Sequence, residues 1–578
     1  MIKEEIKNLV RQACLKLGFP VEEIVLEHPE NVEHGDYSTN VALVLAKQLG
    51  KKPREVAENI AKTINYKLRT VNSIEKVEVA GPGFINFFLS KEYFFDVLSS
   101  ILKKKGKYGA GSEKKKIIVE YSSPNIAKPF GIGHLRSTLI GQAIYNLYTF
   151  LGYKTIGINY PGDWGTPHGK ILYQLKEKLL KGKTEKEKKE ILDKITVQDL
   201  ESLYVAFHQN TTLQMEEGAR LWFKKLEQKD TEARSLWEKM REVSFREFER
   251  IYSLLNVKID HVIGESFFED KMEVVVEDFK KKGLAQESQG ALIVSFPNEI
   301  LPPAMLLKSD GATTYFTRDL ANMEYRISKW KPDAIVIETG VEQTLHFQQV
   351  FLASKLIGYA KDEELVHAFH GLYRTKEGKF STRKGQTIHL EDVLREAIKK
   401  AHEIIEQSET VRGLSEQEKA EVAKAVGIGG IKYNDLSQHP SGDIVFDWGK
   451  ILNLKGNSAP YLQYTYARCK SILRKSKLNP IKFKLNGVKS SPEEMALLRL
   501  LYRFEEVVQE AAEKFSPNLV CNFVFDLAQR YNLFYNTNPV LKAETKELKD
   551  FRLLLTAAVA QIIKNGLSLL GIAAPERM

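Results

Sequence analysis

Three segments near the start of the chain carry apolar residues at helical spacing: Ile2 to Leu17, Asn40 to Leu49 and Pro53 to Ile64. Apolar positions three and four residues apart fall on one face of a helix, so we predict three amphipathic helices. The strand-like segment VEVAGPGFINFFL follows and ends at Leu89. This pattern predicts a compact N-terminal α/β domain over residues 1–112, with a basic, glycine-containing linker from Lys103 to Lys116.

The next region alternates short β-rich runs with an apolar helix. Ile117 to Ser123 reads as a strand, Leu135 to Leu151 as a helix, and the segment TIGINY as a second buried strand. Strand, helix, strand is the order typical of a parallel sheet. The segments IVIETG and LVHAFHG predict later strands of the same sheet, so we expect a parallel-sheet domain over residues 113–385.

Two charged helical stretches interrupt that domain, Leu172 to Leu192 and Thr231 to Leu255, and we expect helical insertions over about residues 170–260. Residues 386–578 carry apolar stripes at helical spacing and predict an all-α domain. The six segments concerned are Glu391 to Gln407, Gln417 to Tyr433, Ser458 to Lys475, Pro492 to Phe515, Asn518 to Tyr535 and Glu547 to Leu569. The fold class is therefore a multidomain α/β protein.

Composition limits the function classes. The chain has 578 residues, and 85 Lys and Arg against 75 Asp and Glu give a formal net charge of +10. That excess allows a polyanionic partner without requiring one. Cys14, Cys469 and Cys521 are far apart and form no Cys-x-x-Cys pair, which argues against a disulfide framework or a structural zinc site. The sequence contains no run of about 18 apolar residues, so we expect no membrane-spanning helix. The N-terminal helix carries charges throughout and does not resemble a signal peptide. The cytoplasm is therefore the expected location.

The turn after the first strand of the parallel sheet carries candidate chemistry. Its sequence, SSPNIAKPFGIGHLRST, contains Lys128, Gly131, Gly133 and His134. Ligands of open α/β sheets bind beyond the carboxyl ends of the strands, where helix N-termini favour phosphate. Glycines allow the backbone to approach a nucleotide, and Lys128 and His134 are possible phosphate donors. Taken alone, such glycines are more often structural.

A second basic, glycine-containing segment is RTKEGKFSTRKGQ, Arg374 to Gln386. A cationic loop of this kind stabilises the charge that develops when pyrophosphate leaves ATP. An exposed basic loop without a function is an equally good interpretation of this segment by itself.

At these two segments the chain resembles the class I aminoacyl-tRNA synthetases: GIGHLRST is similar to their HIGH signature and KFSTRKG to their KMSKS loop. Further blocks resemble the arginyl-tRNA synthetases, and they run the length of the chain. They are GDYSTNVALVLAK, VEVAGPGFINF, VEYSSPNIAKP, NYPGDWGTPHG, LLKSDGATTYFTRDLAN, VEQTLHFQQVF and PYLQYTYARCKSI. The resemblance implies an N-terminal domain that contacts the tRNA elbow, a Rossmann-type catalytic domain and a helical anticodon-binding domain.

The same resemblance implies an arginine pocket. Glu120 and Asp319 match acids that bind the substrate side chain, with Tyr315 beside them. Carboxylates suit a guanidinium because they accept its forked hydrogen bonds. Asn125 and Gln343 match positions that hold the backbone end of the amino acid, and we include Ser123 of the same turn with them. By themselves Tyr315 could be core and Asp319 a helix cap.

For ATP, the resemblance implies binding by Gly131, Gly133, His134, Lys379 and Ser381, and catalysis by Lys128, His134, Arg383 and Lys384. The implied reaction joins the arginine carboxylate to the α-phosphate and then passes the activated arginine to the terminal ribose of tRNA. Mg²⁺ is expected to ride on ATP and not in a protein cage, with no structural metal. Two positions depart from the family pattern: Gly131 replaces the first His of HIGH and Thr382 the second Lys of KMSKS. We expect Lys128 to supply the missing positive charge.

For tRNA(Arg), the block PYLQYTYAR implies contacts through Tyr461, Gln463, Tyr464 and Arg468, although tyrosines at helical spacing are as often core. No DNA or membrane partner is expected, and a monomer is the family default. Rival interpretations are a glutamyl, glutaminyl or cysteinyl enzyme, an inactive RNA-binding paralogue and a free-standing nucleotidyltransferase. Glu120 and Asp319 disfavour an acidic or amide substrate, and the scattered cysteines disfavour the cysteinyl enzyme.

Overall fold

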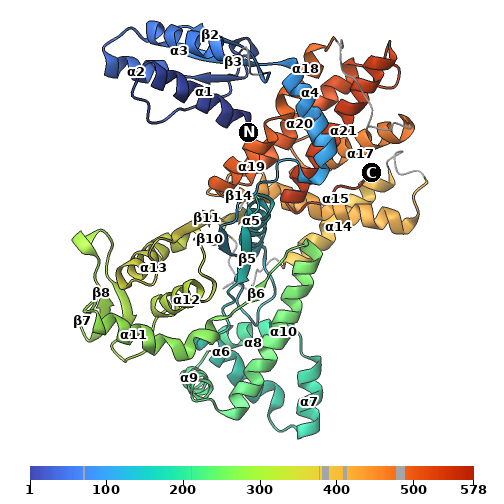
Figure 1. The fold of residues 1–578 in the computed structure, drawn as a ribbon. Coiled ribbons are helices and arrows are strands. Elements are labelled where there is room, and N and C mark those ends of the chain that lie inside the picture. The colour runs from blue at the N-terminus through green and yellow to red at the C-terminus, as the bar shows by residue number, and fades with distance from the viewer. Residues whose placement is uncertain (69–71, 210, 376–377, 380–388, 408–412, 477–488) are drawn as a thin grey trace.

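The computed structural model describes the chain from residue 1 to 578 except for residues 69–71, 210, 376–377, 380–388, 408–412 and 477–488. Figure 1 shows an N-terminal unit (blue) beside a bundle of C-terminal helices (orange to red), with the parallel sheet in the middle and the helical insertions (green) at the opposite end. The fold class expected from the sequence is confirmed.

The N-terminal unit contains the three predicted helices, α1 (Ile2–Lys16), α2 (Val41–Leu49) and α3 (Pro53–Lys67). The single strand-like segment expected there is a hairpin of two strands, β2 (Ile74–Ala80) and β3 (Phe84–Leu89), joined by a turn in which Gly81 and Gly83 both have positive φ. Glycine reaches such angles at low cost, which explains the sharp reversal. With β1 (Tyr37–Thr39) the hairpin forms an antiparallel sheet of order β1-β3-β2.

Helix α4 (Lys91–Lys104) follows the hairpin and was not predicted. Ser90 caps it by accepting a hydrogen bond from the Tyr93 amide at 3.1 Å. The helix packs against α21 (Lys546–Leu569) of the C-terminal bundle, so the N-terminal unit is anchored to the far end of the chain. The predicted linker therefore begins after α4, at the short 3-10 turn Lys105–Lys107.

The predicted parallel sheet has the strand order β11-β10-β4-β5-β6 and every pairing in it is parallel. Its strands are β4 (Lys116–Glu120), β5 (Lys154–Asn159), β6 (His261–Val262), β10 (Ala334–Gly340) and β11 (Glu364–His370). Helix α5 (Ile132–Phe150) connects β4 to β5 and is buried along most of its length. A Cβ at Gly141 would meet the Cβ of Tyr121 at 2.0 Å, so only glycine lets this helix lie so close to the end of β4.

The insertions are α6 (Thr166–Gln174), the π-helical Leu175–Leu180, α7 (Glu185–Lys194), α8 (Val197–Gln209), α9 (Leu213–Glu227) and α10 (Thr231–Leu255). Between β6 and β10 lies a part that the sequence pattern did not predict. It comprises the 3-10 helix η5 (Glu265–Lys271), α11 (Met272–Lys281), the antiparallel strands β7 (Ala285–Ser288), β8 (Ala291–Val294) and β9 (Ala304–Leu307), and α12 (Tyr315–Trp330). These strands are too short and half-exposed for a clear alternating pattern.

After β11 come two short strands, β12 (Tyr373–Thr375) and β13 (Gly378–Lys379), which pair antiparallel. Strand β14 (Ile444–Val445) pairs with β12 in parallel. The C-terminal part is helical, as predicted: α14 (Leu390–Glu406), α15 (Glu416–Leu436), α16 (Trp448–Ile451), α17 (Ala459–Ser476), α20 (Asn518–Thr537) and α21. The segment expected as one helix from Pro492 to Phe515 is broken into α18 (Pro492–Leu501) and α19 (Phe504–Glu513). None of the described helices is long and apolar enough to cross a membrane.

A buried lysine joins these parts. Lys432 on α15 donates hydrogen bonds of 2.6 Å to the carbonyl oxygens of Leu255, at the end of α10, and of Gly571, just after α21. Asn146 on α5 donates to the Leu569 carbonyl beside it at 3.0 Å. Helix C-termini attract cations because their last carbonyls lack partners. The ends of α10 and α21 are thereby held on α15 and α5.

The C-terminal bundle contains a buried ion pair whose loss is predicted to destabilise it. Arg552 on α21 donates to Glu494 at 2.7 Å and also to the oxygens of Pro539 and Asn538. We predict that Arg552→Met lowers the free energy of unfolding by about 3–5 kcal/mol, because the Glu494 carboxylate stays buried without its cation. Denaturant unfolding followed by circular dichroism measures this. Lys546→Met, at an exposed position of the same helix, is the control, and an equal effect of both changes would contradict the prediction.

Candidate active site

The turn between β4 and α5 has a strained backbone. Ser122, Ser123 and Ala127 have φ angles of 77°, 44° and 59°, a region that side-chain-bearing residues enter at a cost of about 1–3 kcal/mol each. Hydroxyl groups from elsewhere hold the turn, because the Ser122 amide donates to Ser137 Oγ at 3.0 Å and the Ala127 amide to Ser244 Oγ at 2.8 Å. Strain of this kind, fixed by surrounding contacts, is typical of a functional turn.

His134 lies in the first turn of α5 with a defined tautomer. The Gly131 amide, at the helix N-cap, donates to His134 Nδ1 at 3.3 Å, so Nδ1 carries the lone pair and Nε2 the hydrogen. Burial, reinforced by the Lys128 ammonium, lowers the pKa of His134 to about 4. The imidazole is therefore neutral at physiological pH and presents Nε2–H as a hydrogen-bond donor.

Lys128 lies on the same turn, with its Nζ over the Tyr204 ring of α8 at 4.5 Å from the centroid. Its positive charge also acts on His168 of α6, whose pKa burial lowers to about 4. Lys128 thus lies close to two neutral imidazoles, the half-buried His134 and the buried His168, of which only His134 was expected from the sequence. Cation, donor imidazole and exposed Gly133 backbone at a helix N-terminus together form a site suited to phosphate oxygens.

Beside this turn, the ends of β4 and α12 bring acidic groups together. Asp319 on α12 contacts His346 Nε2 through Oδ2 at 2.6 Å, and Glu265 on η5 pairs with Arg318 at 3.1 Å. Burial raises the pKa of Tyr160 well above its usual value, and Asp319, Glu265 and Glu120 add to that shift. Tyr160 is therefore within electrostatic range of all three carboxylates.

Glu120 differs from the expectation of a free substrate-binding acid. It is buried and forms an ion pair with the equally buried Arg326 of α12, whose guanidinium also lies 5.7 Å from the centroid of the Tyr160 ring. Burial raises the pKa of the Glu120 carboxyl and Arg326 opposes that shift. Three carboxylates and the guanidiniums of Arg318 and Arg326 leave one excess negative charge when all are ionised, which favours a cationic ligand.

The remaining expected arginine-binding residues lie on nearby turns and at the start of α12, and three of them are exposed. Tyr315 begins α12 and is 62% exposed, with the Arg318 guanidinium 5.4 Å from its ring centroid. Gln343, in the 3-10 turn Val341–Gln343, is also exposed. Ser123 accepts from the Tyr160 amide at 3.3 Å, and Asn125 is exposed beside Gly162. The structure thus places all six expected residues on the carboxyl-terminal side of β4 and β10 or on the adjoining turns and α12.

The basic segment after β12 is described in part. Ser381, Arg383 and Lys384 lie outside the described residues, and Lys379 is placed as part of β13 without a described side chain. The base of the segment is held firmly: Tyr373 donates to Asp435 of α15, and Arg374 pairs with Asp443. Arg136 of α5, 1% exposed, donates to the carbonyls of Gly442 at 2.6 Å and Pro440 at 3.1 Å.

Comparisons with known proteins agree with this geometry over the whole chain. The family model described as "tRNA synthetases class I (R), catalytic domain" matches residues 97–448, the "DALR anticodon binding domain" 462–578 and the "Arginyl tRNA synthetase N terminal domain" 2–89. Two curated arginine–tRNA ligases are similar, from Clostridioides difficile (39% identical, covering 100% of this chain and 99% of the relative) and Clostridium botulinum strain Alaska E43 (38%, covering 100% of each).

Solved structures agree as well. Arginyl-tRNA synthetases from Thermus thermophilus and Plasmodium falciparum are each 25% identical with a TM-score of 0.84. They match over 100% of this chain, and over 100% and 99% of their own chains respectively. The chain belongs to the arginyl-tRNA synthetase family. It is an aminoacyl-tRNA synthetase of class I. The predicted domain boundaries at 112 and 385 remain predictions.

The four residues of α17 that were expected to contact tRNA fall into two groups, one that lines a cavity and one that is internal. Tyr464 and Arg468 line a cavity of about 460 Å³ on α17, together with Tyr535 of α20. The Arg468 guanidinium lies 4.8 Å from the Tyr464 ring centroid and 5.1 Å from that of Tyr535, and it donates to Asn532 at 2.7 Å. Two aromatic rings with a cation between them suit a splayed base and its phosphate.

Tyr461 and Gln463 have internal roles instead. Gln463 has no exposed surface, and its amide donates to the carbonyls of Ala425 at 3.0 Å and Ala573 at 2.8 Å. The expected RNA contact of Gln463 does not fit this placement, since contact would require breaking both bonds. Tyr461 is half-buried, packs edge-on against Phe525 and accepts from Asn532.

Several site residues escaped the sequence reasoning. His168, Glu265, Arg326 and His346 reach the site from α6, η5, α12 and α13 (Thr344–Ile357). Lys128 and His134 could be grouped from the sequence because they lie on one turn. The four other residues come from separate segments, so the sequence alone does not bring them together. The blocks NYPGDWGTPHG and VEQTLHFQQVF contain two of them, but neither block marks the individual residue.

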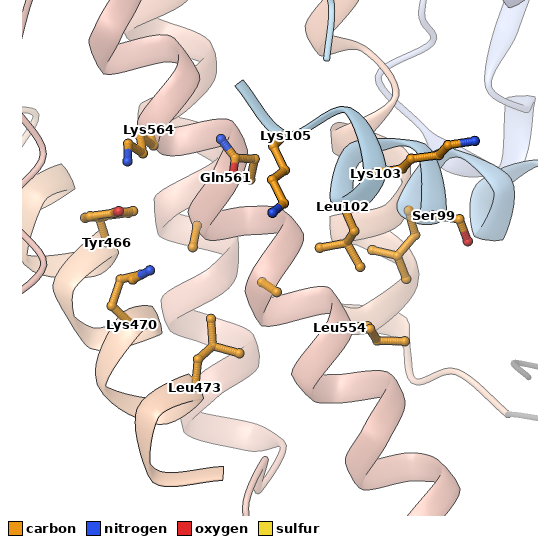
Figure 2. A pocket seen from close by; sticks show the side chains of 13 residues that line it. Ser99, Leu102, Lys103, Lys105, Tyr466, Lys470, Leu473, Leu554, Gln561 and Lys564 are labelled. Atoms are coloured by element: carbon orange, nitrogen blue, oxygen red, sulfur yellow. The ribbon is translucent and has the colours of Figure 1, made fainter. Parts of the chain in front are cut away.

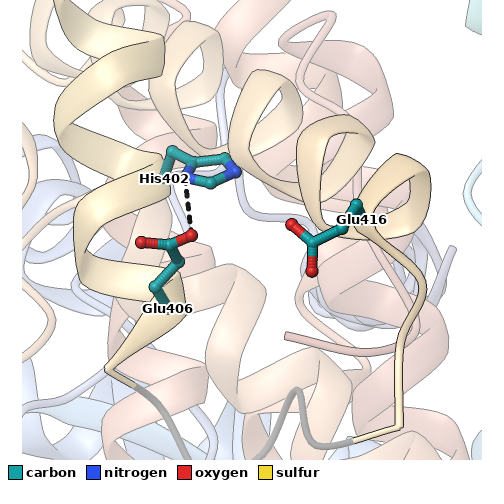
Figure 3. A group of neighbouring side chains, drawn as sticks. All are labelled: His402, Glu406 and Glu416. Carbon is teal, nitrogen blue, oxygen red and sulfur yellow. Dashed lines mark ion pairs between the residues drawn. The ribbon is translucent and has the colours of Figure 1, made fainter.

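A group of possible metal ligands occurs elsewhere among the described residues. His402, Glu406 and Glu416 have ligand atoms within 4.8 Å of one another, on α14 and at the start of α15 (Figure 3). His402 lies 3.6 Å from Glu406, and Glu416 pairs with Lys419 at 2.6 Å. All three side chains lie at the surface, and these ion pairs account for them, so we assign no metal here.

The pocket's acidity predicts a pH dependence of arginine binding. Burial, together with nearby Asp319 and Asp163, raises the pKa of Glu265 to about 7, and Arg318 opposes that shift. Ionisation adds a negative charge, so the affinity for arginine should rise about tenfold from pH 6 to pH 8, as the ionised fraction grows. Calorimetric titration with arginine measures this. We expect Glu265→Gln to remove most of the slope, and an unchanged slope in that variant would contradict the assignment.

Proposed function

We propose that the protein attaches L-arginine to tRNA(Arg) in an ATP-dependent reaction that releases AMP and pyrophosphate. The observation that carries the proposal is the group of three carboxylates, Glu120, Glu265 and Asp319, beside the N-terminus of α5 with Lys128 and His134. A cationic substrate side chain and a triphosphate find complementary charge in adjoining spaces. Membership of the arginyl-tRNA synthetase family supports the same assignment.

The first step joins arginine to AMP. An oxygen of the arginine carboxylate attacks the α-phosphorus in line, and the bond to the departing pyrophosphate breaks. His134 donates through Nε2 to a phosphate oxygen and Lys128 adds positive charge where Gly131 replaces a histidine. The neutral state of His134 suits this role, because its donor hydrogen is present at every physiological pH.

The second step transfers arginine to RNA. The terminal ribose hydroxyl attacks the activated carbonyl, and AMP leaves. Asp319 binds the guanidinium, and the buried Glu120, paired with Arg326, adds negative charge behind it. Tyr315 covers the substrate side chain, and Ser123, Asn125 and Gln343 hold the backbone end. Ser381, Arg383 and Lys384, with Lys379, close over the pyrophosphate. Tyr464 and Arg468 bind the anticodon loop, and Tyr461 supports them from inside the bundle.

The reaction also needs Mg²⁺ and tRNA. Mg²⁺ arrives on the ATP phosphates, and the Lys128 ammonium and the His134 Nε2–H donate to phosphate oxygens and do not bind the metal ion. Adenylation awaits tRNA, the protein acts as a monomer, and DNA and membranes play no part. The three buried cysteine thiols suit the reducing cytoplasm.

A charging assay tests the reaction and the substrate together. Purified protein, ATP, Mg²⁺ and total tRNA are incubated with each of the twenty amino acids in turn, and we expect arginine alone to become RNA-linked. Asp319→Asn should raise the KM for arginine by about 30- to 150-fold, or about 2–3 kcal/mol, because a charge-assisted hydrogen bond is lost. Glu324→Gln removes a negative charge from the same helix and should change the KM little. Charging with another amino acid, or RNA binding without charging, would overturn the proposal.

Lys128 has its own prediction. We expect Lys128→Met to slow single-turnover adenylate formation, measured with tRNA present, by about 2–4 kcal/mol in the barrier while arginine binding is retained. Lys114→Met, an exposed lysine on the linker that precedes β4, is the matched control. An unchanged adenylation rate in Lys128→Met would show that this ammonium does not replace the missing histidine.

A further inference from the structure

A groove of about 750 Å³ runs between three helices at the junction of the N-terminal unit and the C-terminal bundle. Figure 2 shows its lining, in which α21 forms the floor and α17 and α4 form the walls. The floor residues recur at helical spacing and are Leu554, Ala557, Ala560, Gln561 and Lys564. The walls add Tyr466, Lys470 and Leu473 from α17, and Leu98, Ser99, Leu102 and Lys103 from α4, with Lys105 just beyond.

The charged groups of the lining are all positive. It contains four lysines and no carboxylate. Lys470 pairs with Glu576 at 2.9 Å, outside the lining. Lys103, Lys105 and Lys564 are exposed, and within the described part of the chain no carboxylate lies within 4.0 Å of their ammonium groups. The Glu576 carboxylate also acts on Lys564, so Lys103 and Lys105 are the exposed lysines of the lining without an ion pair among the described residues. Exposed cations beside an apolar surface are complementary to a ligand that is both acidic and apolar.

The groove is separate from the cavity on the anticodon side of α17. That cavity takes Tyr464, Arg468 and Lys475 from the helix, whereas the groove takes Tyr466, Lys470 and Leu473. At 3.6 residues per turn, positions two apart point in opposite directions, so the two sets occupy different faces of α17. The two cavities share no lining residue.

The shape of the groove favours a helix as its occupant. Ala557 and Ala560 are small, so they let a neighbouring backbone approach the floor closely, while the leucines of the walls flank it. The floor from Leu554 to Lys564 spans about 15 Å, the length of about three helical turns. Tyr466, the one aromatic residue of the lining, is 2% exposed and offers no ring face to a base, which disfavours single-stranded RNA.

We propose that this groove docks an acidic amphipathic helix of a partner protein, whose apolar stripe covers Ala557, Leu102 and Leu473 and whose carboxylates meet Lys105 in the groove and Lys103 and Lys564 at its rim. Helix-in-groove recognition of this kind relies on apolar anchors three and four residues apart. The docked helix becomes a fourth member of the bundle formed by α4, α17 and α21. This role is independent of aminoacylation, because none of these residues belongs to the catalytic or anticodon sites.

The probe for the test is a fluorescent peptide of about fifteen residues, with leucines at the three-and-four spacing of a helix and glutamates on both flanks. Fluorescence anisotropy with the full-length protein should show saturable one-to-one binding. A peptide of the same composition in scrambled order keeps the charge but loses the stripe, and should bind at least tenfold more weakly. Equal binding of both peptides would overturn the proposal, since attraction would then be purely electrostatic.

Two variants place the binding in the groove. Lys103→Glu combined with Lys564→Glu should weaken the designed peptide at least tenfold, and Ala557→Trp should do so by filling the floor. If the tryptophan variant fails to fold, the double glutamate variant decides. The matched control is Lys186→Glu combined with Lys189→Glu, two exposed lysines on α7. An equal loss in both double variants would overturn the proposal.

Aminoacylation separates a protein partner from RNA. We expect both double glutamate variants to charge tRNA with the same KM, because the groove lies outside the sites for arginine, ATP and the anticodon. A KM for tRNA raised at least fivefold in Lys103→Glu with Lys564→Glu, but not in the α7 control, would show that the groove binds RNA instead and would overturn the proposal.

Discussion

The buried guanidinium of Arg136 fixes the position of the catalytic helix. It lies one turn from the N-terminus of α5, donates to the carbonyls of Pro440 and Gly442, and sits 3.5 Å from Asp435 of α15. A guanidinium stays protonated at any physiological pH, so this contact does not vary with conditions. Because Tyr373, at the base of the basic segment, donates to the same Asp435, the start of α5 and the base of that segment are tied to one buried charged pair.

The arginine pocket is built differently, from charges that nearly cancel. Glu265 pairs with Arg318 and Glu120 with Arg326, while Asp319 contacts His346, so in the proposed pocket the three carboxylates outnumber the two guanidiniums. Isolated carboxylates buried at this depth would protonate, and the two arginines prevent this only in part, as the raised pKa of Glu265 shows. Selectivity for a cation therefore comes from incomplete compensation within the pocket.

The sequence predicted most of the fold because helical and strand periodicities survive wherever one face is buried. The parallel sheet, α5 and the six C-terminal segments were all found in this way. Helix α4 was not predicted, and its basic C-terminal end was assigned to the linker. Strands β7, β8 and β9 were not predicted because they are too short to show a clear alternating pattern. The break between α18 and α19 was also missed, since the apolar stripe continues across it.

The site was predictable only where it is local. Lys128 and His134 share one turn, whereas Arg326 and Glu265 reach the pocket through tertiary packing that no spacing reveals. Gln463 shows the opposite error. Its position among tyrosines in PYLQYTYAR led us to expect a contact with RNA, but its side chain is fully buried.

Helix α17 lines two separate cavities, one on each of two opposite faces. Tyr464 and Arg468 project to one side of it, and Lys470 and Leu473 to the other. A substitution that tilts or shifts the helix must move both sets at once, in opposite senses. The two surfaces are therefore mechanically coupled, so a change in helix position that alters one cavity alters the other as well.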